Sequence, residues 1–439
     1  MPNQDKNFPD CFELNGADSF LLQLDRIMLQ TSGRNNVCTF VVSLKQSIEL
    51  SELELYLSKN TAYQWITRLR IKKGLPFSLI KWVFDETLVL PEIKQFQNKK
   101  DESIAGSLLA TTIRIEEESP FKVDLIQVSD GKSILIFTWH HVLMDAHGGE
   151  SFIRALGMNQ SIDYADLLAG EQTKLLLGLR ASIAQEMKNF LHETSQLPLF
   201  SLYKKPVAKQ NTPILSYRVI SFTEQQTIKI SETARLQGAS FLLSAFYLAA
   251  TTCSVAYIQQ LRGPIEGDVL VPVPLDRRKR GVDTPVIGNQ VTFLFYRIPE
   301  KVLSDVKACT SELIGQMKTL MRTDSPKHYL IMMDFLRRIP GFFYRLMLKR
   351  PTKGLMASFF YSDTGESLQN YDQLFDRSVE SAIHYPPTMY PPGLTFVYSR
   401  FRGSLQITLG YMEQVISDKE VDQLFKHLRS VLLGAEKSG

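Results

Sequence analysis

The stretch SILIFTWHHVLMDAHGGE, residues 133–150, is an almost continuous apolar run that ends in two histidines, an aspartate and a pair of glycines. An apolar run of this length, rich in Ile, Phe and Trp, is typical of a strand that is covered on both faces. The glycine pair with Glu150 and Ser151 predicts the start of a helix that continues to Leu156. Polar side chains are therefore expected between the end of a buried strand and a helix, and we expect the active site there.

The residues on either side of this stretch predict alternating strands and helices. Asp130-Gly131 is a hairpin signal that joins an alternating strand, 121–128, to the 134–139 strand. Further strands are expected at 37–44, 80–84, 215–222, 269–275, 288–296, 355–361 and 394–411, and helices at 20–29, 51–57, 160–195, 223–258, 303–354 and 417–433. Ser51 and Glu54 form a capping-box pattern at one helix start. Strands and helices interleave in both halves, which indicates an α+β fold.

Length and composition indicate two lobes. The chain has 439 residues, of which 44% are hydrophobic and 22% charged, as in ordinary globular proteins. This length exceeds the usual size of one core, so two lobes of about 200 residues each are expected. Polar residues between Pro206 and Pro213 make 204–213 a plausible linker. We place the lobes at 1–205 and 206–439.

Charge and cysteine content exclude several classes of function. The net charge of +4 and the pI of about 8.6 are too mildly basic to indicate a nucleic-acid-binding protein. The four cysteines are far apart and contain no CxxC pair, which predicts neither a disulfide framework nor a zinc ribbon.

The N-terminus does not resemble a secretory signal, so a cytoplasmic location is expected. Residues 238–260 are uncharged but contain too many Ser, Thr and Gln residues for a membrane span, and a buried helix is expected.

The histidine pair allows three interpretations. Strand-end histidines are often hydrogen-bonded structural residues. Adjacent strand residues point to opposite faces, however, so the two side chains cannot both pack on the same side of the sheet. A neutral imidazole can act as a general base, because its ordinary pKa is about 6.5. A metal site would use His140, His141, Asp145 and His147, although neighbouring strand histidines diverge and the spacing matches no metal motif.

His140-His141-x-x-x-Asp145 resembles the HHxxxDG signature of the acyltransferase superfamily that includes chloramphenicol acetyltransferase (CAT) and the condensation domains of nonribosomal peptide synthetases. Wax ester synthases and polyketide-associated acyltransferases belong to the same superfamily. Four other segments resemble family elements in the right order: 24–29 the "LDxxFL" opening, 273–278 the "PVxxR" stretch, 287–289 the "GN" turn, and 361–365 the "SNxxG" strand. The resemblance implies two CAT-like lobes that form a V around a central tunnel.

The resemblance also implies a reaction and a set of roles. His141 would be the general base that takes a proton from a hydroxyl or amine as this acceptor attacks a thioester carbonyl. The donor would be acyl-coenzyme A or an acyl group on the phosphopantetheine of a carrier protein supplied in trans. No permanently bound cofactor, metal or covalent acyl-enzyme is implied. The acceptor would be a small or lipid-like molecule, and the ester-forming relatives favour a hydroxyl.

Supporting roles follow from the same resemblance. Asp145 would pair with Arg278 to fix the loop, and His140 would shape it. Backbone N–H groups near Gly148 and Gly149, together with the Ser362 hydroxyl, would face the oxyanion or the tunnel.

One residue departs from the family pattern. The family glycine after the aspartate is Ala146 here, and the next glycine is Gly148. If that glycine needs a positive φ, alanine cannot freely replace it. Because of this departure, an alternative interpretation stays open: the protein is a catalytically silent relative that binds a carrier protein as a scaffold. A metal-dependent hydrolase is the third candidate.

Residues 335–350 interleave large apolar side chains with arginines and lysine. Such a pattern occurs in helices that lie on anionic membrane surfaces. It also occurs in ordinary core helices whose arginines extend to water, which is the interpretation favoured by the sequence.

Overall fold

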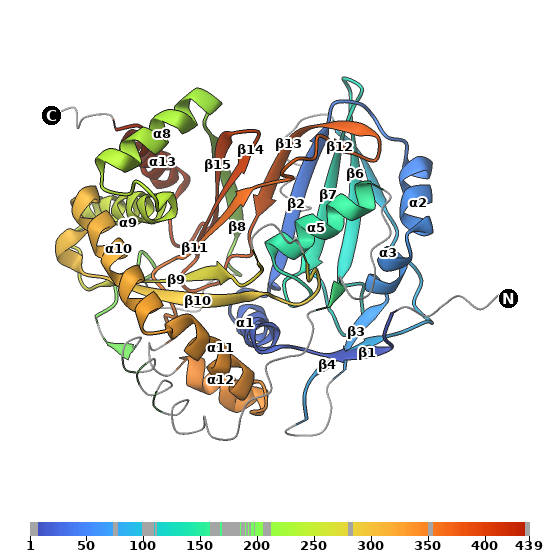
Figure 1. The fold of residues 1–439 in the computed structure, drawn as a ribbon, viewed down its shortest axis with the longest axis horizontal. Helices are drawn as coiled ribbons and strands as arrows, with labels where there is room; N and C mark the ends of the chain where they lie inside the picture. The colour runs from blue at the N-terminus through green and yellow to red at the C-terminus, as the bar shows by residue number, and fades with distance from the viewer. Residues whose placement is uncertain are drawn as a thin grey trace.

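The computed structural model describes residues 8–72, 78–98, 109, 112–158, 167–168, 185, 189, 192, 195–196, 198–204, 212–279, 284–349 and 354–434. Helices and strands interleave around two main hydrophobic cores, which confirms the predicted α+β fold with two lobes (Figure 1). The expected helix at 160–195 and linker at 204–213 lie largely outside the described residues.

The N-terminal lobe is built on a six-stranded sheet with the order β12-β13-β2-β7-β6-β5. Its strands are β2 (Val37–Leu44), β5 (Lys94–Asn98), β6 (Phe121–Val128), β7 (Lys132–His140), β12 (Gln373–Leu374) and β13 (Arg377–Tyr385). β7 pairs with β2 on one side and β6 on the other, and both its faces are buried from residue 135 to residue 140. The continuous apolar run is therefore a central strand, as predicted.

Helices and a small sheet complete this lobe. They are α1 (Gly16–Ser32), α2 (Leu50–Lys59), α3 (Thr61–Ile66), α5 (Ala146–Gly157), and the strands β1 (Cys11–Glu13), β3 (Leu69–Lys72) and β4 (Lys81–Phe84). Helix α5 crosses the sheet in Figure 1, and the ring of Trp139 on β7 lies where a side chain at Gly149 would project. Close approach of this helix to the central strand therefore requires glycine at position 149.

The C-terminal lobe has a four-stranded sheet with the order β11-β14-β15-β8. Its strands are β8 (Leu215–Ser221), β11 (Phe360–Glu366), β14 (Leu394–Phe401) and β15 (Ser404–Met412). The helices α8 (Glu224–Leu236), α9 (Leu243–Arg262), α10 (Val306–Arg322) and α13 (Asp418–Leu433) form the outer layer at the left of Figure 1. Below them lie the hairpin β9 (Val269–Asp276) and β10 (Val291–Ile298), then α11 (Ser325–Leu336) and α12 (Gly341–Lys349).

One segment of the C-terminal half belongs spatially to the N-terminal lobe. β13 pairs antiparallel with β2, with Ala382 opposite Val42 and His384 opposite Phe40. Phe375 and Val379 are buried in the N-terminal core. The division at residue 205/206 therefore describes the order of the chain but not the lobes in space, because residues 373–385 cross from one lobe to the other.

Two helix predictions are resolved by the structure. The capping box at Ser51 is wrong: α2 begins at Leu50, and the Glu49 carbonyl already accepts from the N–H of Leu53 (3.0 Å), so Ser51 lies inside the first turn. The buried helix expected within 238–260 is α9, which packs against α13 and α10. No helix in the described part of the chain is long and apolar enough to cross a membrane.

Candidate active site between the lobes

The HHxxxD stretch contains a short loop, residues 141–144, which we call the His141 loop. β7 ends at His140, and the N–H of Leu143 returns to the His140 carbonyl (2.8 Å) in a tight turn. Trp139 Nε1 donates to the Met144 carbonyl (3.0 Å) and braces the turn from the strand. Asp145 then caps α5 by accepting from the N–H of Gly148 (2.8 Å). The helix thus begins five residues earlier than predicted, because the aspartate rather than Ser151 supplies its start.

His140 is buried between the His141 loop and helix α1. Its side chain is fully buried, and its Nε2 lies 3.1 Å from Asp25 Oδ1 on α1. Its Nδ1 accepts a hydrogen bond from the N–H of Val142 (3.3 Å). The ring proton is therefore on Nε2, which donates a hydrogen bond to Asp25. Burial raises the pKa of Asp25, but His140 and the hydrogen bonds from Asn35 and Asn36 outweigh it and hold this pKa below its ordinary value. His140 therefore connects α1 to β7.

His141 lies on the wall of a cavity between the lobes. Its N–H donates to the Asn36 carbonyl (2.8 Å), and its own carbonyl accepts from Nδ2 of Asn289 (2.8 Å). Burial lowers the pKa of His141, and the raising effects of its own carbonyl and of Asp145 are smaller. The imidazole is therefore neutral near pH 7. Since Nδ1 is buried, Nε2 is the ring nitrogen that can reach a molecule in the cavity.

Asp145 is held from the opposite lobe by Arg278. NH1 and NH2 of Arg278 each lie 3.0 Å from a carboxylate oxygen of Asp145, and the arginine side chain is only 4% exposed. Arg278 also donates to the Pro285 carbonyl through Nε (3.1 Å) and NH2 (2.9 Å). The N–H of Gln290 donates to the same carboxylate (2.8 Å). This bidentate pair ties the His141 loop to the β9–β10 hairpin, as the sequence resemblance implied.

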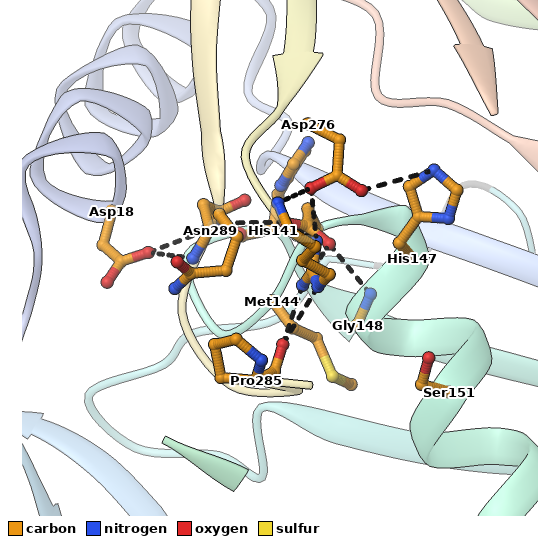
Figure 2. A network of polar contacts seen from close by, with 12 residues as sticks. Asp18, His141, Met144, His147, Gly148, Ser151, Asp276, Pro285 and Asn289 are labelled. Carbon is orange, nitrogen blue, oxygen red and sulfur yellow. Dashed lines mark hydrogen bonds and ion pairs between the residues drawn. The ribbon is translucent and has the colours of Figure 1, made fainter. Parts of the chain in front are cut away.

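Asn289 joins three parts of the site. Asp18, at the start of α1, accepts from the backbone N–H (2.7 Å) and from Nδ2 (2.8 Å) of Asn289 (Figure 2). Burial raises the pKa of Asp18 to about 6, against the lowering effect of these hydrogen bonds. Gly288, with φ +81°, donates its N–H to the Leu143 carbonyl (2.7 Å). The glycine makes the left-handed turn that presents Asn289 to both α1 and His141.

Sequence reasoning assigned no role to Asp18, Asp25 or Asn289. Asn15 and Asp18 do form a local capping box, a signal for a helix start that the sequence analysis did not use. Asn289 is known from the sequence only as part of the "GN" turn at 287–289. Neither the capping box nor this turn shows that Asp18 and Asn289 meet, since they are 271 residues apart in the chain.

The glycines after Asp145 do not offer free donors. The N–H of Gly148 is bound to the Asp145 side chain, and the N–H of Gly149 donates to the Asp145 carbonyl (2.9 Å). A Cβ at Gly148 would lie 2.2 Å from the Val286 carbonyl oxygen. The expectation that these N–H groups stabilise an oxyanion is therefore corrected: both glycines serve helix packing and capping. Ser362, on β11, does line the cavity.

Ala146 fits its position without strain. It is the first residue of α5, and it is absent from the residues with positive φ. A helical residue of this kind needs no glycine. Ala146 also lines the cavity, so its methyl group forms part of the wall beside His141.

The cavity has a volume of about 230 Å³ and is lined from both lobes. Much of its wall is apolar and includes Phe20, Leu24, Met28, Phe293, Phe295 and Met356. The polar part includes His147, Asp276, Ser362 and Asp363, and His147 Nε2 lies 3.9 Å from Asp276 Oδ2 (Figure 2). Burial raises the pKa of Asp363. The cavity wall thus combines apolar side chains, polar side chains and the His141 imidazole.

The residues considered as metal ligands do not converge. His140 is directed at Asp25, His147 at Asp276, and Asp145 at Arg278. Throughout the described ranges, no group of three or more His, Cys, Asp or Glu side chains is arranged to hold a metal ion. The divergence follows from the strand geometry, which sends His140 and His141 in opposite directions.

Neither a protein-family model nor a curated protein matches this sequence. Solved structures do match over nearly the whole chain. The first condensation domain of the CDA synthetase is 13% identical, with 98% of this chain and 97% of that chain covered and a TM-score of 0.66. The trichothecene 15-O-acetyltransferase TRI3 from Fusarium sporotrichioides is 11% identical (96% and 95% covered, TM-score 0.66).

A third match is the starter condensation domain of rhizomide synthetase RzmA, in a mutant form in complex with C8-CoA and Leu-SNAC; it is 13% identical, with 97% of this chain and 94% of that chain covered and a TM-score of 0.64. All three match this chain over nearly its whole length and theirs. The chain therefore has the fold of these condensation domains and of this acetyltransferase, as the resemblance of its HHxxxD stretch implied.

Proposed function

We propose that this protein is an acyltransferase that moves an acyl group from a thioester to a hydroxyl or amine acceptor, with His141 as the general base. The observation that carries the proposal is the position of His141. Its neutral imidazole lies on the wall of the inter-lobe cavity, in a loop fixed by the buried Asp145–Arg278 pair. A base held in this way needs no reorganisation before it accepts a proton.

The proposed reaction proceeds in two steps without a covalent acyl-enzyme. Nε2 of His141 takes the proton of the acceptor as the acceptor oxygen or nitrogen forms a bond to the thioester carbonyl carbon. The negative charge then develops on the carbonyl oxygen, where the Ser362 hydroxyl is the candidate donor. When the tetrahedral species collapses, the carbon–sulfur bond breaks and the leaving thiolate takes the proton back from His141. The products are the ester or amide and a free thiol.

The donor is proposed to be acyl-coenzyme A or an acyl-carrier protein. Support comes from the match to a condensation domain crystallised with C8-CoA and from the apolar part of the cavity wall, which suits an acyl chain. The TRI3 match, an O-acetyltransferase, favours a hydroxyl acceptor. No step requires a resident cofactor.

The alternative is a catalytically silent relative that binds a carrier protein. The replacement of the family glycine by Ala146 motivated it, but the structure places this alanine in a helical conformation beside the cavity. The geometry of the loop therefore gives no reason for inactivity, and we favour the enzyme.

The test is a thiol-release assay with a panel of acyl-coenzyme A donors and simple alcohols and amines. His141→Ala is expected to lower acceptor-dependent release by roughly 10²- to 10⁴-fold, the usual contribution of a general base. His328→Ala, a histidine on α11 outside the cavity, is the matched control and should retain activity.

Equal release by the wild-type protein and His141→Ala would remove His141 as the base. If no coenzyme A donor reacts, a carrier protein loaded with the same acyl groups is tried. Inactivity with both kinds of donor, in protein that still binds the loaded carrier, would establish the silent scaffold.

A further inference from the structure

Helices α11 and α12 present large apolar side chains to solvent. We call the surface formed by Phe335, Phe342, Phe343 and Leu346 the α12 face. Phe342 and Phe343 are 66% and 56% exposed, and their rings meet edge-on with centroids 5.7 Å apart. Two adjacent phenylalanines exposed to this degree are unusual on a protein that has no partner at that surface.

The opposite side of the same helices reaches the cavity wall. Tyr344 on α12 is buried in a small core with Tyr329 and Leu336 of α11. Phe20 and Phe295 pack against this core, and both also line the cavity that contains His141. The α12 face is therefore the outer surface of a layer whose inner surface bounds the substrate cavity.

Basic residues outnumber acidic residues in this segment, and its Lys327 pairs with Asp324 just outside it (3.6 Å). Residues 325–349 contain five basic residues, Lys327, Arg337, Arg338, Arg345 and Lys349, and one acidic residue, Asp334. Asp334 is paired with the buried Arg337 (2.6 Å). Arg345 and Lys349 instead bind the neutral side chains of Gln23 (2.9 Å) and Gln30 (3.2 Å), and Arg338 is exposed. The helices thus combine exposed aromatic side chains with a surplus of positive charge.

We propose that the α12 face docks on the surface of an anionic lipid bilayer. Phe342, Phe343 and Leu346 enter the boundary between headgroups and acyl chains, and the basic residues lie against the lipid headgroups. The charge surplus favours this occupant over a second copy of the chain, whose identical basic segment would be repelled at a shared face. Docking places the outer wall of the cavity next to a source of apolar substrate.

The experiment measures co-sedimentation of the full chain with vesicles of phosphatidylcholine alone and of equimolar phosphatidylcholine and phosphatidylglycerol. Binding is expected with the anionic vesicles and is expected to weaken as salt is added. Each of Phe342→Ser and Phe343→Ser should weaken partitioning by roughly tenfold, the effect of removing one buried aromatic group. Arg338→Gln should weaken it by roughly fivefold.

Phe241→Ser is the matched control. Phe241 is 98% exposed in the connection between α8 and α9, which lie apart from α12 in Figure 1, so this variant should bind like the wild-type protein. Because the measurement needs no acyl transfer, it stands independently of the proposed activity.

Several outcomes would overturn the proposal. They are equal binding to neutral and anionic vesicles, no binding to either, or equal loss of binding in Phe241→Ser. A change of solution mass in Phe342→Ser, with vesicle binding unchanged, would assign the face to self-association. Vesicle binding that is absent while an acidic carrier protein binds through the same residues would assign the face to that protein.

Discussion

His140 and His141 are consecutive in the chain, yet they occupy opposite environments. His140 is fully buried in the N-terminal core and directed at Asp25. His141 lines a cavity between the two lobes, and its Nδ1 is buried. The difference arises because neighbouring residues at a strand end point to opposite sides of the sheet. His140 connects the strand to α1, and His141 is the residue that we propose as the general base.

The two histidines are also held by different parts of the molecule. His140 depends on α1 of its own lobe, whereas the His141 loop depends on Arg278 and Asn289 from the β9–β10 region. The loop is thus held between the lobes, which places the proposed active site at their junction. Substitutions at the partners of each histidine should therefore separate the structural role of His140 from the proposed catalytic role of His141.

Loss of Arg278 should have the largest effect. Arg278→Ala leaves the buried Asp145 carboxylate without its bidentate partner and is expected to destabilise the protein by about 3 to 5 kcal/mol. Activity should fall with it, because the His141 loop is released. Urea unfolding provides the measurement, and the exposed Lys279→Ala is the neighbouring control. A stability equal to that of the wild-type protein would show that the lobes do not depend on this pair.

The structural role of His140 is tested by substitution of its partner, Asp25. Asp25→Ala removes the acceptor of His140, of Asn35 and of the Asn36 N–H, and should cost about 2 to 3 kcal/mol of unfolding free energy. Asp25→Asn keeps one carbonyl acceptor and should cost less. If kcat fell as strongly as in His141→Ala while stability was unchanged, His140 would have a role in the chemistry rather than in the fold.

The pH dependence of activity addresses His141 directly. Burial places its pKa below the ordinary value of 6.5, and the base must be neutral. kcat/KM should therefore be constant above about pH 6.5 and fall about tenfold per pH unit once the pH passes below the lowered pKa. Asp18, with a pKa of about 6, titrates nearby, so the profile is repeated in Asp18→Asn. A decline that begins above pH 7 would contradict a neutral, buried base.

The smallest effect is expected at Ala146. Ala146→Gly introduces the glycine of the HHxxxDG signature, and it should cost at most about 1 kcal/mol of stability because glycine is the weaker helix former. Acyl transfer should change by less than about threefold, a difference of under 1 kcal/mol. A large gain in activity would instead show that the alanine methyl group obstructs the cavity and would favour the scaffold interpretation for the natural chain.

Local pattern was sufficient for much of the fold. The run before His140 predicted a central strand, and the alternation of 121–128 with Asp130-Gly131 predicted its hairpin partner, both of which the structure contains. The crossover strand β13 was missed. Its register shifts between Val379 and Ser381, which interrupts the alternation by which a strand is recognised.

The sequence by itself determined the two-lobed α+β class and the identity of the HHxxxD stretch, because periodicity and motif spacing are local properties. Its resemblance also named the Asp145–Arg278 pair. Only the tertiary structure decided that Asp18, Asp25 and Asn289 support the histidines, that the Gly148 and Gly149 N–H groups are already bound, and that residues 373–385 belong to the other lobe. Chain folding, rather than local pattern, brings His140 to Asp25, Asp18 to Asn289 and β13 to β2, each across more than 100 positions. The two glycine N–H groups are instead bound locally, to Asp145.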